Sequence, residues 1–336
     1  MKSILVTGGT GSFGKAFVKR LLREHGPERI VVFSRDELKQ YEMATEIPDG
    51  RLRFFIGDVR DKDRLMRAMY GIDTIVHTAA LKHVPIAEYN PFECIKTNVH
   101  GAMNVIDCAI DAGVDRVVAL STDKAAMPIN LYGASKLVSD KLFVTAQSYV
   151  GSRKTRFSVV RYGNVMASRG SVIPFFLKQR EKGVIPVTDR RMTRFWITLE
   201  QGVDMVLMAA RSMQGGEIFV PKIPSMRILD LVEAVAPGCD IVDVGIRPGE
   251  KLHELMIPAD DARRTVEFAS HFIVCPELDY WNSDNYPDAR RVPDRFEYSS
   301  DTNAEWLTVA RMRAMLTELG LDLTFPGSAH ASAPAP

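Results

Sequence analysis

Short apolar runs alternate with longer amphipathic stretches along the first half of the chain. Six of these runs are expected to be strands, at 4–6, 30–33, 52–56, 74–77, 116–120 and 157–161. Strands that are apolar on both faces are typical of a parallel sheet covered by helices. Because helical patterns separate the runs, we predict an α/β fold with a doubly wound, right-handed parallel sheet of the Rossmann type.

The second half of the chain has a more mixed pattern. A helix at 199–210 and a strand at 217–220 are expected to return to the Rossmann sheet. The Rossmann domain is therefore predicted to comprise residues 1–165 and about 198–222, and a smaller mixed α/β lobe about 166–197 and 223–320. Elements expected in that lobe lie at 223–235, 241–246 and 272–275, with a long loop at 280–295 and a terminal helix at 303–319. Residues 321–336 are predicted to form a disordered tail.

Composition narrows the class of protein. Of the 336 residues, 46% are hydrophobic and 25% are charged, as in ordinary globular enzymes. A net charge of +1 gives no reason to expect a nucleic-acid partner. The four cysteines have no metal-binding spacing, no apolar run is long enough for a membrane span, and no signal peptide is recognised before the first strand. We therefore expect a cytoplasmic protein with reduced thiols.

A glycine-rich turn leaves the first predicted strand. Glycines at 8, 11 and 14 give the spacing GxxGxxG ahead of a helical pattern. Such a turn lets the backbone approach a pyrophosphate, whose charge meets the free N–H groups of a helix N-terminus. The turn could also be only a turn and a helix cap, but its place between strand and helix favours cofactor binding. The expected contacts are Gly8, Thr10, Gly11, Ser12, Phe13 and Gly14.

Two cationic side chains follow the second predicted strand. Arg35 stands after Ser34 at the strand tip, and Lys39 lies one helical turn further on. A carboxylate at this place would favour NAD, whereas an arginine suits the 2′-phosphate of NADP. Asp36 is expected to cap the next helix. We therefore expect Ser34, Arg35 and Lys39 to bind NADP, with a solvated helix start as the alternative.

Further cofactor contacts are expected at the next two strand ends. Asp58 could accept a hydrogen bond from the adenine amino group and Val59 could pack on the ring, although Asp58 could equally be a helix cap. The small residues Thr78 and Ala79 would let the cofactor lie across the sheet edge. The remaining candidates are Lys82, which could contact cofactor or substrate, and Asn98, on a helix expected at 91–112.

The chemistry is expected where the fifth strand ends and the next helix begins. Open α/β sheets keep their ligands outside the carboxyl ends of the strands, here at Thr122, Asp123 and Lys124. Tyr132 and Lys136 lie four residues apart, so they share one face of the helix expected at 130–149. A lysine ammonium beside a tyrosine favours the phenolate, which can then act as a base.

Together these residues resemble the extended short-chain dehydrogenase/reductases, and within them the nucleotide-sugar 4,6-dehydratases. The resemblance extends over about residues 2–310. Among the 4,6-dehydratases, the chain most resembles the inverting UDP-N-acetylglucosamine 4,6-dehydratases of pseudaminic acid synthesis. It is carried by the segments SRDELKQ (34–40), AALKHVP (79–85), STDKAA (121–126), RYGNV (161–165), MTRFW (192–196) and RPGEK (247–251). Retaining relatives carry an Asp-Glu pair after the threonine, whereas this chain has Asp123-Lys124, as in the inverting group.

The resemblance implies a reaction in three parts: oxidation of C4 by NADP, elimination of the C5 hydrogen with the C6 hydroxyl, and return of the hydride to C6. Tyr132 would accept the O4 proton, Thr122 would bond O4, and Lys136 would hold the nicotinamide ribose. Lys124, alone or with Asp123, would remove the C5 proton, and Asp123 would protonate the departing hydroxyl. The product would be UDP-2-acetamido-2,6-dideoxy-β-L-arabino-hex-4-ulose. Reprotonation of C5 by Tyr132 is a hypothesis.

The resemblance also implies the partners. UDP-N-acetylglucosamine would contact Lys82, Thr122, Asn164, Arg169, Arg194, Arg247 and Glu250, while Val165 would contact the cofactor. Each arginine alone could equally be a surface residue. A homo-oligomer, dimer or hexamer, is expected. Two alternatives remain open: a UDP-N-acetylhexosamine 4-epimerase, which needs no acid/base pair at 123 and 124, and a non-catalytic NADP-sensing protein, which would tend to lose Tyr132 or Lys136.

Overall fold

The computed structural model describes residues 1–166, 168, 171–277, 281 and 285–323. The chain divides into two compact units. Unit 1 comprises Met1–Gly163, Thr198–Lys222 and Leu255–Ser299, and unit 2 comprises Asn164–Ile197, Ile223–Glu254 and Ser300–Pro336. Each unit has its own sheets and helices and is described separately.

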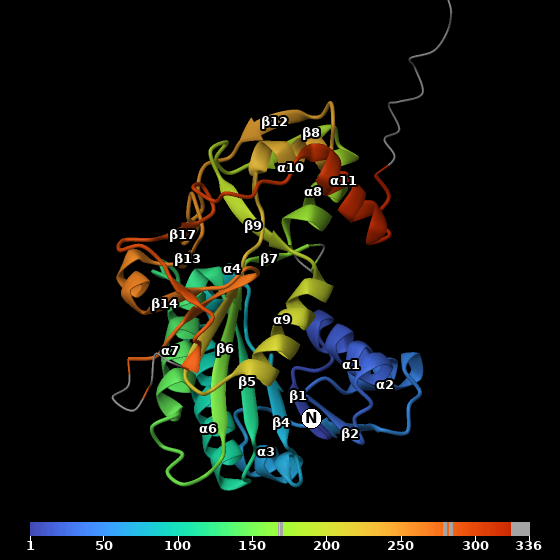
Figure 1. The fold of residues 1–336 in the computed structure, drawn as a ribbon. Coiled ribbons are helices and arrows are strands. Elements are labelled where there is room, and N and C mark those ends of the chain that lie inside the picture. The colour runs from blue at the N-terminus through green and yellow to red at the C-terminus, as the bar shows by residue number, and fades with distance from the viewer. Residues whose placement is uncertain (167, 169–170, 278–280, 282–284, 324–336) are drawn as a thin grey trace, which may run out of the picture. The chain divides into compact units, whose positions relative to one another are not determined.

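Unit 1 is built on a ten-stranded sheet in the order β16-β14-β15-β10-β6-β5-β4-β1-β2-β3 (Figure 1). All neighbouring strands from β10 to β3 are parallel, which confirms the predicted Rossmann sheet. These parallel strands are β1 (Ser3–Thr7), β2 (Arg29–Ser34), β3 (Leu52–Ile56), β4 (Thr74–His77), β5 (Arg116–Thr122), β6 (Arg156–Tyr162) and β10 (Glu217–Pro221). Except in the edge strand β3, their central residues are almost entirely buried because helices cover both faces.

Helices lie on both sides of this sheet (Figure 1). On one side α1 (Ser12–Glu24) contacts α9 (Leu199–Ser212), and α2 (Glu37–Glu46) lies beside α1. On the other side are α3 (Lys62–Met69), α6 (Gly101–Asp111) and α7 (Leu131–Ala146), and α6 contacts both neighbours. Two short helices, α4 (Val84–Tyr89) and α5 (Pro91–Ile95), precede α6.

The helix predicted at 91–112 is continuous but not uniform. Between α5 and α6 the segment η1 (Lys96–His100) is a π-helical turn. A π turn inserts one extra residue into an α-helix and is frequent at functional sites. The sequence pattern predicted the helix but not this irregularity, because apolar spacing reports a helical face and not a local change in hydrogen bonding.

The domain boundary drawn from the sequence needs a correction. Residues 255–299 were expected in the smaller lobe, whereas the structure places them in unit 1. The physical reason is the edge of the large sheet: β15 (His271–Val274) pairs antiparallel with β10 and is buried throughout. Beyond it lie β14 (Thr265–Glu267) and β16 (Arg290–Arg291). The same part of unit 1 contains η3 (Ala259–Arg264) and the pair β13 (Leu255–Ile257) and β17 (Tyr298–Ser299).

Unit 2 is a smaller mixed α/β unit. One sheet contains β7 (Asn164–Val165), β9 (Thr193–Ile197) and β11 (Ser225–Arg227), and a second pairs β8 (Val184–Val187) with β12 (Asp240–Asp243). Its core buries Trp196 among side chains from α8 (Val172–Arg180), α10 (Ile228–Val235) and α11 (Val309–Glu318). The terminal helix begins six residues later than predicted because Thr308 caps it by accepting from the Arg311 amide.

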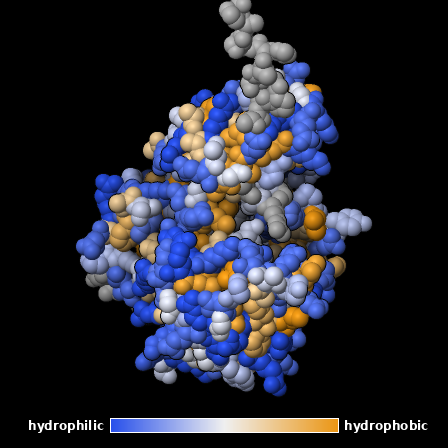
Figure 2. Space-filling view, turned by 90° about the vertical axis from the view of Figure 1, so that its right-hand side faces the viewer, coloured by the Kyte–Doolittle hydropathy of each residue, from blue (hydrophilic) through white to orange (hydrophobic). Residues whose placement is uncertain are grey.

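Polar and apolar side chains mix on the face shown in Figure 2. Within the described ranges, no helix has the length and apolar character needed to cross a membrane. The same residues contain no cluster of histidine, cysteine and carboxylate side chains that could hold a metal ion. The four cysteines are free thiols, which agrees with the sequence prediction.

Candidate functional site

The predicted catalytic residues of the Thr122–Lys124 segment lie in direct contact. Strand β5 ends at Thr122, which caps the short helix η2 (Asp123–Ala125). The Thr122 hydroxyl donates to Asp123 Oδ1 over 2.8 Å, and Lys124 Nζ donates to the same oxygen over 3.0 Å. Asp123 is fully buried, and its Oδ2 finds no hydrogen-bond donor among the described residues. This oxygen can therefore accept a hydrogen bond from a ligand.

Helix α7 brings Tyr132 and Lys136 to the same place. Asn130 caps the helix by accepting from the Gly133 amide over 2.7 Å. Gly133 then packs against the backbone of the Lys124 segment: a Cβ atom at this position would lie 2.2 Å from the Lys124 carbonyl oxygen. Only glycine permits such an approach without movement of the chain. The first turn of α7 is therefore pressed against η2, and Tyr132 hydrogen-bonds Thr122.

The groups around Tyr132 shift its pKa in opposite directions. Burial raises the pKa of Tyr132 to about 12, the Lys124 ammonium lowers it, and the Asp123 carboxylate raises it again. The hydrogen bond with Thr122 also lowers this pKa. The sequence suggested Lys136 as the cation that favours the phenolate, and the structure adds Lys124 as a cation that lowers the pKa of Tyr132. One lysine thus serves two neighbours, the Asp123 carboxylate and the Tyr132 phenol.

Lys136 is a buried lysine whose pKa is shifted by its surroundings. Burial lowers the pKa of its ammonium, and the carboxylate of Asp140, one helical turn further along α7, raises it. The Lys136 ammonium also acts on His77 at the end of β4. Burial and this ammonium lower the pKa of His77 to about 3. Among the described residues, Lys136 has no hydrogen bond or ion pair. Its three N–H donors are thus available for a ligand.

Sequence analysis missed a second layer of side chains behind the catalytic ones. Asp140 Oδ2 accepts from Ser121 Oγ over 2.7 Å and from Arg161 Nη2 over 3.1 Å. The Arg161 side chain also donates to the Met256 carbonyl over 2.9 Å. The spacing of four residues that joined Tyr132 to Lys136 could have pointed to Asp140, since the same helical face continues to that residue.

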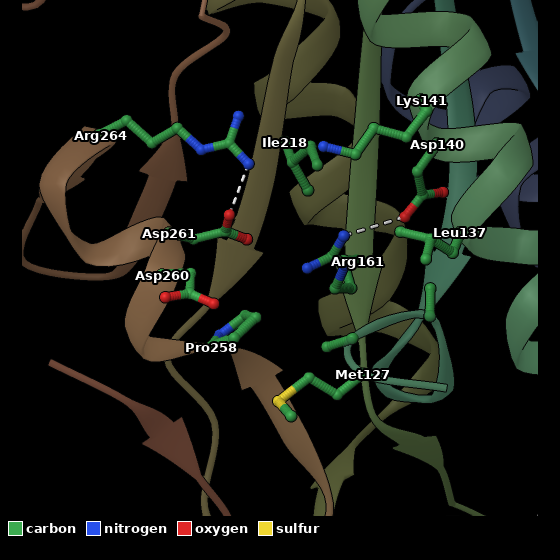
Figure 3. A pocket seen from close by; sticks show the side chains of 12 residues that line it. Met127, Leu137, Asp140, Lys141, Arg161, Ile218, Pro258, Asp260, Asp261 and Arg264 are labelled. Carbon is green, nitrogen blue, oxygen red and sulfur yellow. Dashed lines mark hydrogen bonds and ion pairs between the residues drawn. The ribbon is translucent and has the colours of Figure 1, made fainter. Parts of the chain in front are cut away.

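Asp140 and Arg161 form part of the wall of a pocket of about 220 Å³ (Figure 3). The pocket is lined from the loop after η2, from α7 and from η3, and Asp261 and Arg264 form a second ion pair on its wall. Met127 in that loop has a φ of 46°, a backbone conformation that is uncommon for side chains larger than glycine. The lining includes none of the predicted catalytic side chains.

The glycine turn has the geometry of a dinucleotide-binding turn. Gly8 has a φ of 64°, and a Cβ there would lie 2.9 Å from Ala79 Cα and Thr78 Oγ1. A Cβ at Gly14 would lie 2.5 Å from Gly9, so α1 begins tightly packed against the turn. Gly11 precedes the first residue of α1, with no side-chain hydrogen bond to the helix amides. The turn therefore offers free N–H groups to a phosphate, together with Thr10, Ser12 and Phe13.

The cationic side chains after β2 are engaged with acids. Arg35 Nη1 lies 3.4 Å from Asp58 Oδ2, and Lys39 Nζ lies 2.6 Å from Asp36. Asp36 caps α2 as the sequence predicted, by accepting from the Lys39 amide. Burial would raise the pKa of Asp58, but hydrogen bonds from Arg60 outweigh this effect and lower it. Ser34 is buried and accepts from the Gln40 side chain.

Asn98 lies in the π turn and joins two parts of the site. Its amide oxygen accepts from the Leu81 N–H over 2.8 Å, and its amide nitrogen donates to the Leu81 carbonyl and to Ser135 Oγ, both over 2.9 Å. Ser135 belongs to α7, between Tyr132 and Lys136. Asn98 thus fixes the loop after β4, which carries the exposed Lys82, to the catalytic helix. Val59 is buried against Gly101.

The residues predicted to bind substrate are mostly in unit 2. Asn164 and Val165 form β7, and Arg194 lies on β9. Arg194 donates to the Leu252 and Lys251 carbonyls, each over 3.0 Å, so it secures the loop that carries Arg247 and Glu250. Arg247 is exposed and lies 3.9 Å from Glu250. Arg169 lies outside the described residues.

Comparisons with known proteins agree with this geometry. Residues 4–276 match the model of the polysaccharide biosynthesis protein family. The chain is 55% identical to "UDP-N-acetylglucosamine 4,6-dehydratase (inverting)" of Campylobacter jejuni serotype O:2, over 91% of this chain and 94% of that protein. It is 42% identical to "UDP-glucose 4-epimerase" of Rickettsia conorii, over 81% and 82% of the two chains.

Two solved structures resemble the fold. The structure of Pen from Bacillus thuringiensis superposes with a TM-score of 0.87 and 38% identity, and covers 95% of this chain and 98% of that one. DesIV from Streptomyces venezuelae, a dTDP-glucose 4,6-dehydratase with NAD and TYD bound, has a TM-score of 0.66 and 27% identity over 74% and 86% of the chains.

Proposed function

The chain belongs to the polysaccharide biosynthesis protein family, and on this premise we propose that it is a UDP-N-acetylglucosamine 4,6-dehydratase that inverts C5. A nicotinamide dinucleotide supplies the hydride chemistry when bound. The observation that carries the proposal is the contact between Lys124 Nζ and Asp123 Oδ1, which lies beside Thr122 and Tyr132. A sugar dehydratase needs a further acid and base next to the tyrosine that accepts the O4 proton, whereas an epimerase does not.

Each side chain of the site has a proposed proton-handling role. Tyr132 accepts the O4 proton when C4 is oxidised, and Thr122 holds O4 by a hydrogen bond. The C4 ketone then acidifies the C5 proton, which Lys124 removes, while Asp123 in its acid form protonates the departing C6 hydroxyl. Lys124 must be neutral at that moment, and its partial burial favours the neutral form while Asp123 opposes it. Tyr132 is proposed to reprotonate C5 from the opposite face.

NADP is proposed as the cofactor, in preference to NAD. Arg35 and Lys39 stand where a 2′-phosphate would lie. Such a phosphate would compete with the Asp58 and Asp36 carboxylates for these two cationic side chains. The proposed contacts also include Asn98, which the structure shows holding the loop after β4. The substitution Arg35→Ala tests the preference: it should raise the KM for NADP at least ten-fold and leave the KM for NAD almost unchanged. An equal effect on both cofactors would contradict the assignment.

We propose that residues of unit 2, together with Lys82, bind the substrate. Asn164, Arg169, Arg194, Arg247 and Glu250 are the proposed contacts of UDP-N-acetylglucosamine, with Val165 against the cofactor. Support comes from the cationic character of this set, since guanidinium groups suit a pyrophosphate. Glu250 Oε2 is buried with no donor among the described residues and is proposed to accept from the uridine ribose. We further propose a cytoplasmic homo-oligomer, dimer or hexamer, that serves pseudaminic acid synthesis and flagellin glycosylation.

The test is incubation with UDP-N-acetylglucosamine in deuterated water, followed by NMR of the product. The proposal expects loss of the C6 hydroxyl, a keto group at C4, L-configuration and deuterium at C5, with no net consumption of cofactor. A galacto-configured product with its C6 hydroxyl intact would instead show the epimerase that was the alternative. A keto sugar of D-configuration would contradict inversion.

A further inference from the structure

Asp140 occupies a position that the reaction steps above do not use. It lies on α7 four residues after Lys136 and eight after Tyr132, on the same face of the helix. Only 2% of the Asp140 surface and 4% of the Lys136 surface are exposed. A buried carboxylate is costly unless it is paired, so its presence on this face calls for a reason.

The Asp140 carboxylate is held in place from two strands. Ser121 at the end of β5 donates to Oδ2 over 2.7 Å. Arg161 on β6 donates to the same oxygen over 3.1 Å (Figure 3). Arg161 is itself anchored to the Met256 carbonyl. Ser121 is the residue before Thr122, so the carboxylate is tied to the strand that carries the catalytic segment. Its position relative to Lys136 is therefore fixed by three elements.

We propose that Asp140 is a positioning residue that keeps the buried Lys136 side chain in its ammonium form, ready for the cofactor ribose and the tyrosine. The inference rests on the proposed function, since it assumes that Lys136 acts as a cation in the reaction. Asp140 does not touch the reacting atoms and acts only through Lys136.

The other groups that face Lys136 cannot take this role. His77 on β4 is neutral near pH 7 because its pKa is about 3. Tyr132 on α7 and Tyr162 on β6 have pKa values raised by burial, so both are protonated. Asp140, which also pairs with Arg161, is the anion that raises the pKa of Lys136.

The substitution Asp140→Asn tests the proposal, because it keeps the shape of the side chain and removes its charge. Activity is measured from pH 5.5 to 10 with UDP-N-acetylglucosamine and saturating cofactor. We expect the alkaline limb of the kcat profile to move down by roughly 1 to 3 pH units, the range for loss of a close opposite charge. The acid limb should move in the same direction, since Asp140 also raises the pKa of Tyr132.

Three further variants separate this role from a structural one. Asp140→Glu retains the charge and should restore the limbs. Asp261→Asn removes the acid of the neighbouring Arg264 pair, which lies on the same pocket wall, and should leave both limbs where they are. If Asp140→Asn does not fold, the double variant Asp140→Asn/Arg161→Met is compared with Arg161→Met alone, so that only the Asp140 charge differs, and the limbs of the double variant should lie lower.

Two results would overturn the proposal. The first is an Asp140→Asn enzyme whose activity falls equally at every pH with unchanged limbs, which indicates a purely structural pair. The second is an equal displacement in Asp261→Asn. The wild-type enzyme is assayed for the keto sugar in parallel: if it forms none, the proposed function fails, whereas normal wild-type turnover with unmoved limbs in the variant rejects only the role of Asp140.

Discussion

Replacing Gly133 with alanine should separate Tyr132 from its neighbours without changing any catalytic side chain. The added Cβ would lie 2.2 Å from the Lys124 carbonyl oxygen and 3.1 Å from Pro128 Cβ. Ordinary van der Waals contact begins at 3.4 Å, so the first turn of α7 and the Lys124 segment must separate by more than 1 Å. Neither neighbour is a flexible side chain end, since one is backbone and the other a proline ring.

The expected loss of activity follows from this displacement. A misplacement of about 1 Å at a reacting group can cost about 100-fold in rate, so kcat should fall by about two orders of magnitude. The stability change should be smaller: overpacking costs about 1–3 kcal/mol, and alanine in a helix recovers about 1 kcal/mol relative to glycine. The free energy of unfolding should therefore change by no more than about 2 kcal/mol.

The assay compares kcat for keto-sugar formation with urea denaturation of the same preparation. Gly202→Ala in α9 is the matched control, because its added Cβ would lie at least 3.7 Å from its nearest neighbours, Phe13 and Tyr162. That variant should keep its activity and its fold. A Gly133→Ala enzyme with wild-type kcat would refute the reasoning, since it would show that the close approach of α7 to the Lys124 backbone does not position Tyr132.

Three other perturbations have expected outcomes. Lys124→Ala should still oxidise C4, so the absorbance of reduced nicotinamide at 340 nm should rise once per active site while no dehydrated sugar forms; turnover of the keto sugar by this variant would rule out Lys124 as the base. Asn98→Ala should leave the half-buried Leu81 amide and carbonyl without their Asn98 partner, at a cost of at most about 1–3 kcal/mol for each group, measured by urea denaturation. An unchanged denaturation midpoint would contradict the importance of these bonds. His77 has a pKa of about 3 when folded, against about 6.5 when unfolded. The unfolded chain therefore binds the extra proton between these values, and acidification from pH 6.5 should lower stability by up to about 1.4 kcal/mol per pH unit. His77→Gln should weaken this dependence, and an equal slope in wild type and variant would show that His77 does not cause it.

The sequence predicted the parallel sheet well, for a physical reason. Buried parallel strands have short, wholly apolar centres, so β1 and β2 are visible as the unbroken apolar runs 4–6 and 30–33. The spacing of Tyr132 and Lys136 reports a helix face in the same direct way. Helix caps such as Asp36 were also predictable, because a cap is a local interaction between residues three positions apart.

What the sequence did not show depends on contacts between distant residues. The pairing of β15 with β10 joins segments more than fifty positions apart, and no local pattern announces it. Arg194 was predicted to contact the substrate pyrophosphate, and its hydrogen bonds to the Leu252 and Lys251 carbonyls could not be seen in the sequence. The electrostatic role of Lys124 toward Tyr132 also needed coordinates, because it arises from the packing of α7 on η2.

The π turn at Lys96–His100 adds one residue to its helix, and the contacts of Asn98 depend on that extra residue. An α-helix rotates by about 100° per residue, and the extra residue of the π turn is what lets Asn98 face Leu81 and Ser135 while α5 and α6 both keep their apolar sides on the protein. Deletion of one residue in this turn would give a straighter and more regular helix. It would also swing the carboxamide away from the loop and from α7, so that added regularity would release the loop after β4 from α7.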